Sequence, residues 1–309
     1  MNPLASLYGS VVSVRNSLYD RGTLKVRKLR GPVVSIGNIA VGGSGKTPFL
    51  ITLGELLLQR GVAFDVLSRG YGRATRGVAL VDPEGSPRDF GDEPLLIARK
   101  LRVPVIVGED RFAAGRFAEQ RFGARVHLLD DGFQHRRLAR NFDIVLLTPT
   151  DAGDALLPAG RLREPLSALA RADAVVATND MLLDGLPLDH QQVWRVSRGI
   201  MRPAVEGRCL AFCGIARPQN FFADLSAAGI TLSGTRAFSD HHVYTKSDVH
   251  KLRAAPERND ATAFVTTEKD EINLGALASD LAPLHVIRLQ MRLENGEALV
   301  QAMLARIGE

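Results

Sequence analysis

Residues 35–48 read Ser35-Ile36-Gly37-Asn38-Ile39-Ala40-Val41-Gly42-Gly43-Ser44-Gly45-Lys46-Thr47-Pro48, a glycine-rich turn that contains Gly-Lys-Thr. The apolar run 32–36 is typical of a short buried strand, and leucines recur at helical spacing over 48–59. A glycine-rich loop between a strand and a helix presents backbone N–H groups to phosphate oxygens, and the helix N-terminus adds a partial positive charge. The sequence therefore predicts a phosphate-binding loop over residues 40–47.

Individual residues of this loop have expected roles in binding a nucleotide. Lys46 reaches the β- and γ-phosphates in loops of this kind, and the Thr47 hydroxyl ligates Mg²⁺. The usual pattern has a glycine where this chain has Ala40, so the later glycines supply the conformational freedom. A plain glycine-rich turn is the alternative, but the strand-to-helix context favours phosphate binding. The predicted nucleotide-binding residues are Ala40, Val41, Gly42, Gly43, Ser44, Gly45, Lys46 and Thr47.

Length and composition indicate a globular protein with two domains or one large one. The chain has 309 residues, of which 45% are hydrophobic, and it contains two cysteines. Cys209 and Cys213 are too few for a disulfide framework and have no second Cys/His pair at zinc-site spacing, so we expect buried thiols. No run of about eighteen apolar residues occurs, so we expect no transmembrane helix.

The positive charge is concentrated at the N-terminus. Residues 1–30 contain six Lys and Arg residues against one acidic residue, which equals the net charge of +5 of the whole chain. Apolar residues from Leu4 to Tyr19 form a broad face if this segment is helical. An amphipathic segment followed by clustered basic residues is suited to an anionic membrane surface. An ordinary helix that packs on the first domain and carries a solvated basic tail is the alternative, and the residues alone leave both open.

Alternating strand and helix signals predict an α/β fold, namely a doubly wound, mostly parallel sheet like that of phosphate-loop NTPases, with a second, smaller α/β domain. The expected strands of the first part are 32–36, 63–67, 78–81, 103–107, 126–129, 143–147 and 174–177, and its expected helices are 48–59, 93–100 and 111–122. Three parts are predicted: a basic amphipathic segment (1–30), the phosphate-loop domain (31–205) and the smaller domain (206–309). The polar segment 179–207 is the predicted linker, and a late strand is expected at 285–289.

A pair of carboxylates follows a predicted strand in the middle of the chain. Asp130 and Asp131 come directly after the apolar run 126–129. A carboxylate at such a strand end is the usual partner of a phosphate loop, because it holds Mg²⁺ opposite the loop hydroxyl. Adjacent side chains of a strand point to opposite faces, so we expect one aspartate to serve the metal and the other the nucleophile or the loop. A solvated turn is the alternative.

Two further motifs remain undecided from the residues alone. Gly91-Asp92-Glu93-Pro94 is also what an ordinary helix start looks like, since acidic residues are favoured in a first turn. The pair His241-His242 after Asp240 is a pattern that is more often structural, or a weak metal site, than catalytic.

Eight segments in this order resemble the tetraacyldisaccharide 4′-kinase family. They are SIGNIAVGGSGKTP (35–48), LSRGYGR (67–73), GDEP (91–94), LLDDGFQHRRLARNFDIVLL (128–147), LPAGRLREP (157–165), FCGIARPQNFF (212–222), FSDHHVYT (238–245) and FVTTEKD (264–270). The resemblance covers nearly the whole chain. It implies ATP-dependent, Mg²⁺-dependent transfer of the γ-phosphoryl group to the 4′-hydroxyl of an acylated glucosamine disaccharide 1-phosphate, which gives lipid IVA. It also implies a peripheral enzyme, expected to be a monomer without a nucleic-acid partner, whose N-terminal helix holds the cytoplasmic face of the bacterial inner membrane.

The resemblance also implies roles for residues that match the family motifs. Asp92 would accept the proton of the sugar hydroxyl, and His241 would pair with it, although the neighbouring His242 leaves that choice open. The aspartate pair and Gln134 would position Mg²⁺ and the attacking hydroxyl, with Asp131 counted among the catalytic residues and both aspartates among the metal ligands. The basic residues expected to receive the substrate 1-phosphate or the ATP phosphates are Arg69, Arg73, Arg161 and Arg163.

Two other functions share the phosphate loop. A membrane-associated ATPase or GTPase switch would use the same loop and basic N-terminus, but it has no use for an acceptor base. A soluble small-molecule kinase or synthetase would have no need of the amphipathic N-terminus. ATP is expected rather than GTP, because the segment 267–270, Thr-Glu-Lys-Asp, has only a superficial likeness to a guanine-reading motif.

Overall fold

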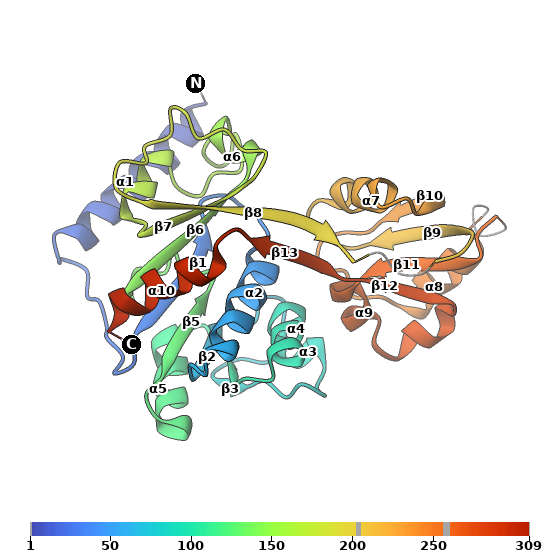
Figure 1. The fold of residues 1–309 in the computed structure, drawn as a ribbon, viewed down its shortest axis with the longest axis horizontal. Helices are drawn as coiled ribbons and strands as arrows, with labels where there is room; N and C mark the ends of the chain where they lie inside the picture. The colour runs from blue at the N-terminus through green and yellow to red at the C-terminus, as the bar shows by residue number, and fades with distance from the viewer. Residues whose placement is uncertain (1, 202–204, 256–259, 309) are drawn as a thin grey trace.

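The protein is built around two sheets of unequal size (Figure 1). The structure is a computed structural model that describes residues 2–201, 205–255 and 260–308. The larger sheet has nine strands in the order β13-β8-β7-β6-β1-β5-β2-β4-β3, and the smaller has four in the order β10-β9-β11-β12. Neighbouring strands are parallel except at the two ends of the larger sheet, where β13 pairs with β8 and β3 with β4 in antiparallel fashion. The predicted α/β fold with a mostly parallel sheet is confirmed.

The elements have the following bounds. The strands of the larger sheet are β1 (Val33–Asn38), β2 (Phe64–Ser68), β3 (Ala79–Leu80), β4 (Val105–Val107), β5 (Val126–Asp130), β6 (Phe142–Leu147), β7 (Ala174–Thr178), β8 (Gln192–Ile200) and β13 (Leu289–Leu293). The helices that belong with it are α1 (Pro3–Asp20), α2 (Lys46–Gln59), α3 (Pro87–Phe90), α4 (Asp92–Leu101), α5 (Arg111–Phe122), α6 (Pro149–Ala152), the 3₁₀ helix η1 (Leu166–Arg171) and α10 (Gly296–Ile307). The second unit contains β9 (Arg208–Cys213), α7 (Pro218–Ala227), β10 (Thr231–Ala237), α8 (Lys246–Arg253), β11 (Ala263–Thr267), α9 (Glu268–Leu274), the 3₁₀ helix η3 (Gly275–Leu281) and β12 (Leu284–Ile287).

Helices cover both faces of the larger sheet. Every residue of β1, β2, β5 and β6 is buried, as expected for parallel strands enclosed on two sides. Side chains of α2, α4 and α10 pack on one face together with Val34 and Ile36 of β1, whereas α5 packs on the other face with Val33. This alternation along β1 follows from the period of two in a strand, and β1 is the middle strand of the nine.

The end of the chain departs from the predicted division into domains. The predicted linker 179–207 contains β8, which extends from the larger sheet toward the second unit (Figure 1). The predicted strand 285–289 is split between β12 in the small sheet and β13 in the large one. Helix α10 then packs against α2. Residues 289–307 therefore lie with the larger sheet, whereas the sequence analysis placed all of 206–309 in the smaller unit. The prediction missed this because pairing between β8 and β13 is a long-range contact without a local sequence signal.

The two cysteines are buried and free. Burial raises the pKa of Cys213 to about 12. Both thiols therefore have the inert, structural character that the sequence indicated. Within the three described stretches, no helix is long and apolar enough to cross a membrane.

Candidate functional site

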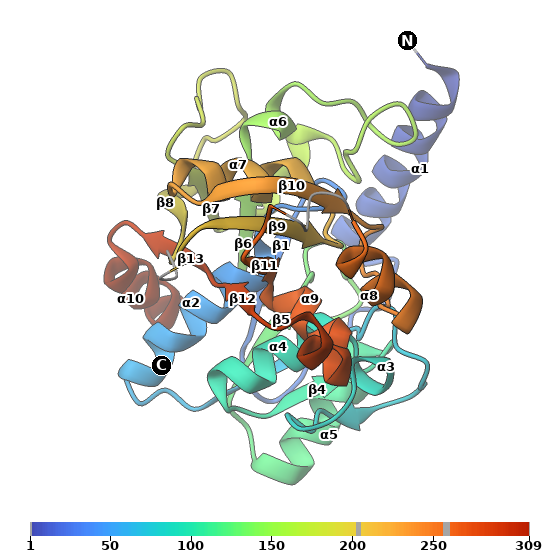
Figure 2. The same cartoon turned by 90° about the vertical axis from the view of Figure 1, so that its right-hand side faces the viewer.

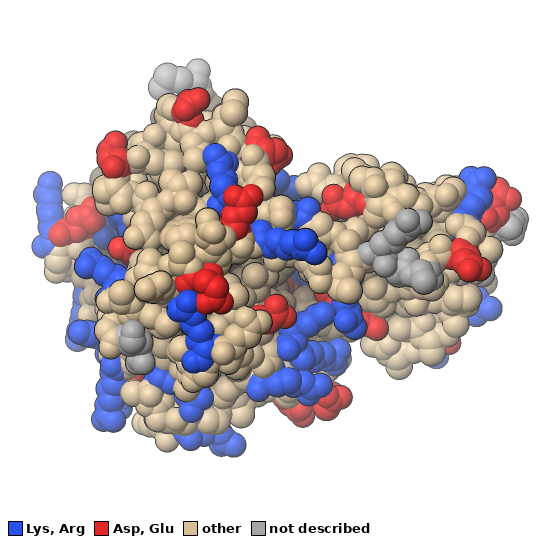
Figure 3. Space-filling model, in the orientation of Figure 1, with Lys and Arg blue, Asp and Glu red and all other residues tan. Residues whose placement is uncertain are grey.

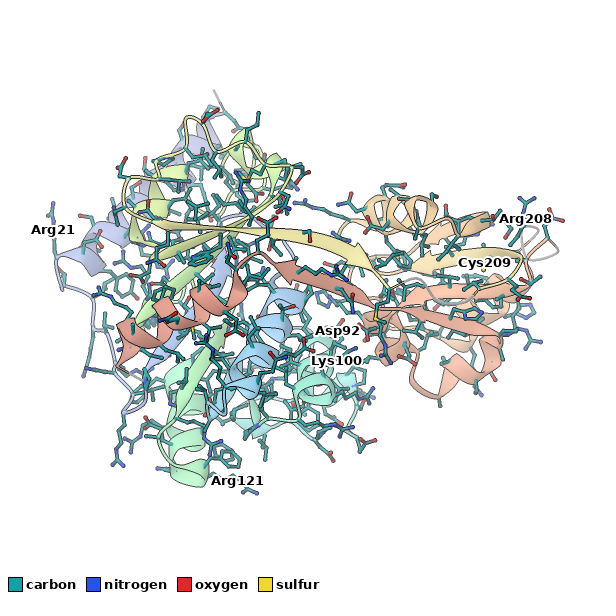
Figure 4. The ribbon with its side chains drawn as sticks, viewed as in Figure 1. Arg21, Asp92, Lys100, Arg121, Arg208 and Cys209 are labelled. Carbon is teal, nitrogen blue, oxygen red and sulfur yellow. The ribbon has the colours of Figure 1, made fainter. Side chains whose placement is uncertain are left out.

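A cavity of about 1000 Å³ lies between the phosphate loop and the second unit. Every residue of the loop 40–47 lines it, as do Asp92, Gln134 and His241. In Figure 2 the second unit faces the viewer and lies in front of the larger sheet. Figure 4 places Asp92 at the junction of the two units. Lys and Arg side chains gather beside the notch between the units, on the side of the larger unit, in the space-filling view (Figure 3). The cavity is therefore suited to an anionic ligand.

The phosphate loop follows a path that requires glycine. β1 ends at Asn38 and α2 begins at Lys46, and the loop between them contains glycines with positive φ. Gly45 has a φ of +81°, and a Cβ atom there would lie 2.3 Å from the Met291 side chain, so a larger residue would both strain and obstruct the turn. The side-chain amide of Asn38 donates a hydrogen bond to Ser44 Oγ at 2.7 Å and closes the loop.

Lys46 is held at the mouth of the loop by polar neighbours. Its Nζ donates to Asn38 Oδ1 at 3.2 Å and lies 3.5 Å from Asp131 Oδ1. Arg163 donates to both carboxylate oxygens of Asp131, at 2.9 and 2.8 Å, and also contacts the Asn38 side chain. Two cations and one carboxylate thus surround the position where the loop presents its N–H groups.

Asp130 and Asp131 lie beside the loop because β5 is the neighbour of β1, with Asp130 opposite Ile36. Asp130 accepts a hydrogen bond from Ser68 Oγ at 2.8 Å, while its Oδ1 is buried and has no hydrogen-bond partner among the described residues. Burial, together with the charges of Glu93 and Asp131, raises the pKa of Asp130 to about 6.

Asp131 has a different environment from its neighbour. It leaves the strand with a φ of +50°, which turns its side chain toward the cations. Burial alone would raise the pKa of Asp131, but the hydrogen bonds from Arg163 and the charge of Lys46 outweigh burial and hold it well below the usual range. The two aspartates therefore have different partners and opposite pKa shifts.

Asp92 and His241 meet across the junction of the two units. Asp92 begins α4 and is 4% exposed, and Nδ1 of His241 lies 3.0 and 2.9 Å from its two carboxylate oxygens. Asn273 donates to Asp92 Oδ2 at 3.1 Å, and Lys269 Nζ lies 3.9 Å from the same oxygen. Burial would raise the pKa of Asp92, but the His241 hydrogen bond and the Lys269 charge lower it to about 2. The hydrogen bond to Asp92 in turn raises the pKa of His241.

His242 points into the second unit instead. Its ring stacks on Phe238 with centroids 4.7 Å apart and packs against Tyr244, and its Nε2 lies 3.2 Å from Asp248 Oδ2. Geometry thus distinguishes the two histidines that the sequence left equivalent: His241 is the partner of Asp92, and His242 belongs to an aromatic cluster.

The structure separates the four expected arginines into two pairs. Arg69 and Arg163 line the cavity. Arg73 and Arg161 are not among its lining residues: the side chain of Arg73 is 2% exposed and bound to Glu109, and that of Arg161 is bound to Asp154. Each of the latter two guanidinium groups has a local carboxylate partner, which sequence spacing did not reveal.

Gln134 lies between the loop and a neighbouring carboxylate. Its Nε2 donates to the Asn38 carbonyl oxygen at 2.9 Å and to Glu164 Oε1 at 3.0 Å. Helix α1 reaches the same region, since Asn16 donates to Glu164 at 2.7 Å and Arg15 to the Gln134 carbonyl at 2.7 Å. The N-terminal helix is therefore bound directly to segments that border the cavity.

Several cavity residues had no predicted role. Lys269 and Asn273, on α9, contact Asp92, and Arg217, from the loop before α7, lines the cavity beside the phosphate loop. Lys269 and Arg217 stand in the segments 264–270 and 212–222, which are among the eight segments that resemble the kinase family. Their positive charge within these segments is the sequence feature that could have identified them. Asn273 had no signal, because only the tertiary fold brings it to Asp92.

Comparison with known proteins gives one consistent family. The family model of tetraacyldisaccharide-1-P 4′-kinase (LpxK) matches residues 1–308. The tetraacyldisaccharide 4′-kinase of Koribacter versatilis is 51% identical over 98% of this chain and 98% of the relative, and that of Chlorobaculum parvum is 41% identical over 87% and 82%. A crystal structure of LpxK from Aquifex aeolicus in complex with ATP is similar with a TM-score of 0.80 and 34% identity, covering 99% of this chain and 97% of that one.

Proposed function

The chain belongs to the tetraacyldisaccharide 4′-kinase family, and from this membership we propose how its cavity carries out the kinase reaction. The enzyme is a phosphotransferase of lipid A biosynthesis that uses ATP to phosphorylate the 4′-hydroxyl group of tetraacyldisaccharide 1-phosphate. The observation that carries the mechanism is the Asp92–His241 pair, which the two units bring together in the cavity that the phosphate loop lines. An ATPase switch without an acceptor gives no reason for this pair.

ATP would bind with its phosphates on the loop amides and Lys46. The donor set also fits Mg²⁺, which prefers oxygen ligands and usually keeps only one or two protein carboxylates beside water and phosphate. Asp130 has a buried oxygen that no described residue binds, and the Thr47 hydroxyl belongs to the same cavity. We assign the binding of Mg²⁺ to Asp130 and Thr47. We assign to Asp131 the task of holding Lys46 and Arg163 in place. When bound, the metal neutralises charge on the β- and γ-phosphates.

Asp92 would act as the base toward the 4′-hydroxyl. A carboxylate with a pKa near 2 is ionised at neutral pH and therefore ready to accept a proton. A sugar hydroxyl has a far higher pKa, so the carboxylate contributes mainly as the proton leaves in the transition state. His241 orients the carboxylate and, being on the second unit, makes the base complete only when the two units are together. Closure of this kind also excludes water from the reaction.

The basic and apolar groups near the cavity would bind the lipid. Arg69 is our candidate for a substrate phosphate, because it lines the cavity whereas Arg73 and Arg161 are occupied by carboxylates. Gln134 would help to place the sugar, since it lies between the loop and Glu164. One chain supplies both sides of the cavity, so we propose that a monomer is active.

Helix α1 would hold the enzyme on the membrane. Leu4, Leu7, Val11 and Val14 form one stripe at helical spacing, and each is at least 60% exposed. On a different face of the helix Val12 and Tyr19 are buried, so the helix both packs on the protein and presents apolar side chains outward. Exposed basic residues follow it at 21–30. This combination supports peripheral docking on an anionic surface, which we place at the cytoplasmic face of the inner membrane.

The test is transfer of label from γ-labelled ATP to tetraacyldisaccharide 1-phosphate in detergent micelles, with Lys46→Ala as the matched variant. We expect labelled lipid from the wild type and a loss of about 10²–10³ in kcat for the variant, since Lys46 is a phosphate-facing donor. ATP hydrolysis that depends on Lys46 but leaves the lipid unlabelled would support the switch instead. Label on a soluble acceptor, unaffected by deletion of residues 1–30, would support a small-molecule kinase.

A further inference from the structure

Arg217 of the second unit lies directly on the phosphate loop of the larger one. It ends the connection between β9 and α7. A Cβ atom built on Gly43 would lie 3.0 Å from Cγ, Cδ and Nε of Arg217, and one built on Gly42 would lie 3.4 Å from the Ala216 side chain. The arginine stem therefore rests on the loop where its glycines carry no side chains, and Arg217 lines the cavity at this place.

The guanidinium group of Arg217 has a buried nitrogen without a partner. Its Nη2 is buried and makes no hydrogen bond within the part of the chain that the structure describes. Two other arginines that line the cavity have carboxylate partners, Arg163 with Asp131 and Arg198 with Asp224. Burial lowers the pKa of Arg217, and the neighbouring charge of Arg161 adds to the effect. A buried cationic donor without an acceptor is unfavourable, so an anion in the cavity would supply what the protein does not.

The position of Arg217 identifies the part of the nucleotide that it would meet. The backbone and the lysine of a loop of this kind together hold the β- and γ-phosphates, and Lys46 stands at the start of α2. Arg217 lies over Gly43, and its neighbour Ala216 lies beside Gly42, so this turn covers the middle of that loop. Its guanidinium is a planar donor with several N–H groups, suited to bind two phosphate oxygens at once.

On the basis of the proposed function, we propose that Arg217 is a further catalytic residue. This arginine, supplied from the second unit, stabilises negative charge between the β- and γ-phosphates during transfer. The bond between the γ-phosphorus and the bridging oxygen breaks, and its electron pair stays on the oxygen of the departing ADP. A bond forms between the γ-phosphorus and the 4′-oxygen, whose proton passes to Asp92. Arg217 donates hydrogen bonds where charge accumulates on the leaving oxygen.

The experiment compares Arg217→Ala with Arg217→Lys and with Arg208→Ala, a matched control. Arg208 is an exposed arginine that lies at the far end of the second unit (Figure 4). Arginines of the proposed kind contribute about 10³–10⁵ in kcat. We expect Arg217→Ala to lose that factor at an unchanged affinity for ADP, Arg217→Lys to recover only part of it, and Arg208→Ala to match the wild type. Added guanidinium ion should partly restore Arg217→Ala.

A second readout does not depend on turnover. ADP with aluminium fluoride and Mg²⁺ mimics the transferring phosphoryl group, and its equilibrium affinity is measured beside that of ADP alone. We expect Arg217→Ala to weaken binding of the mimic by at least tenfold while ADP binding stays within about twofold. Equal weakening of both, or a kcat within about threefold of the wild type, overturns the inference.

The design separates this inference from the proposed function. A wild type that labels no lipid refutes the function, whereas an active wild type with an active Arg217→Ala variant refutes the role of Arg217 alone. Thermal unfolding shows whether the alanine variant folds. If it does not, Arg217→Lys decides, because lysine keeps the stem and the charge: a full wild-type kcat in that variant counts against the arginine-specific role, and a loss of at least tenfold supports it.

Discussion

The two sides of the cavity are built in different ways. The larger sheet contributes groups that are consecutive in the chain, namely the loop 40–47 and the pair Asp130–Asp131, placed side by side because β1 and β5 are neighbours. The second unit contributes single residues from separate segments, His241 and Arg217 from loops and Lys269 from α9. The first side is complete within one sheet. The second exists only while the units are together, so nucleotide binding and catalytic competence should be separable by mutation.

The largest effect that separates them is expected from Asp92→Asn. This change removes the charge of the proposed base while keeping the size of the side chain, so kcat should fall by about 10²–10⁴ with ATP affinity little changed. Initial rates of lipid phosphorylation and a nucleotide titration measure the two quantities. The matched control is Asp89→Asn, an exposed position three residues earlier that should keep full activity. Retention of kcat in Asp92→Asn would remove Asp92 from the mechanism.

The adjacent histidines provide the next test. His241→Ala should lower kcat by about 10–10², because Asp92 loses the hydrogen bond that orients it. His242→Ala should leave kcat within about twofold but lower the free energy of unfolding by about 1 kcal/mol, since its ring packs in the aromatic cluster and contacts Asp248 within the second unit. Steady-state kinetics and chemical denaturation of both variants measure these effects. A larger kinetic loss in His242→Ala than in His241→Ala would reverse the assignment.

The contact between the two sides should also appear in the pH dependence of stability. The pKa of Asp92 is lowered to about 2, so its contribution is present above its ordinary pKa of 3.8 and is lost as the pH falls toward 2. The pKa of His241 is raised, so its contribution is present below 6.5 and is lost as the pH rises through the folded-state pKa. The stabilisation by the pair is thus greatest between about pH 4 and pH 6.5.

Denaturant unfolding of the wild type and Asp92→Asn across this range measures that contribution. The difference in unfolding free energy should reach about 2 kcal/mol within the window, as expected from a pKa lowered from 3.8 to about 2, and should shrink on both sides. A difference that does not change with pH would show that the pair does not contribute as an ion pair.

The smallest expected effect concerns a third region, α1, and should leave both sides of the cavity intact. Leu7→Ser should weaken binding to vesicles that contain anionic lipid by about tenfold, because burying a leucine side chain is worth roughly 1.5–3 kcal/mol. Leu58→Ser changes an exposed leucine on α2 and should not affect vesicle binding. Co-sedimentation measures the affinity, and ATP affinity should be equal in both variants. Equal vesicle binding by Leu7→Ser and the wild type would argue against docking through α1.

Much of the first side of the cavity was predictable from residues 35–48 and 126–131. Glycine spacing restricts the loop backbone, and apolar runs with intervening helices make a parallel sheet the natural arrangement. The predicted boundary at residue 206 was wrong for residues 289–307, because their pairing with β8 and packing on α2 depend on contacts that no short segment encodes.

The sequence by itself determined the fold class, the phosphate loop and the position of acidic residues at a strand end, because each rests on consecutive residues and on the periodicity of local structure. The tertiary structure alone decided which histidine meets Asp92, which arginines face the cavity and which aspartate keeps a free oxygen. Asp92 and His241 are 149 positions apart, and only the packing of one unit against the other brings such residues within hydrogen-bonding distance.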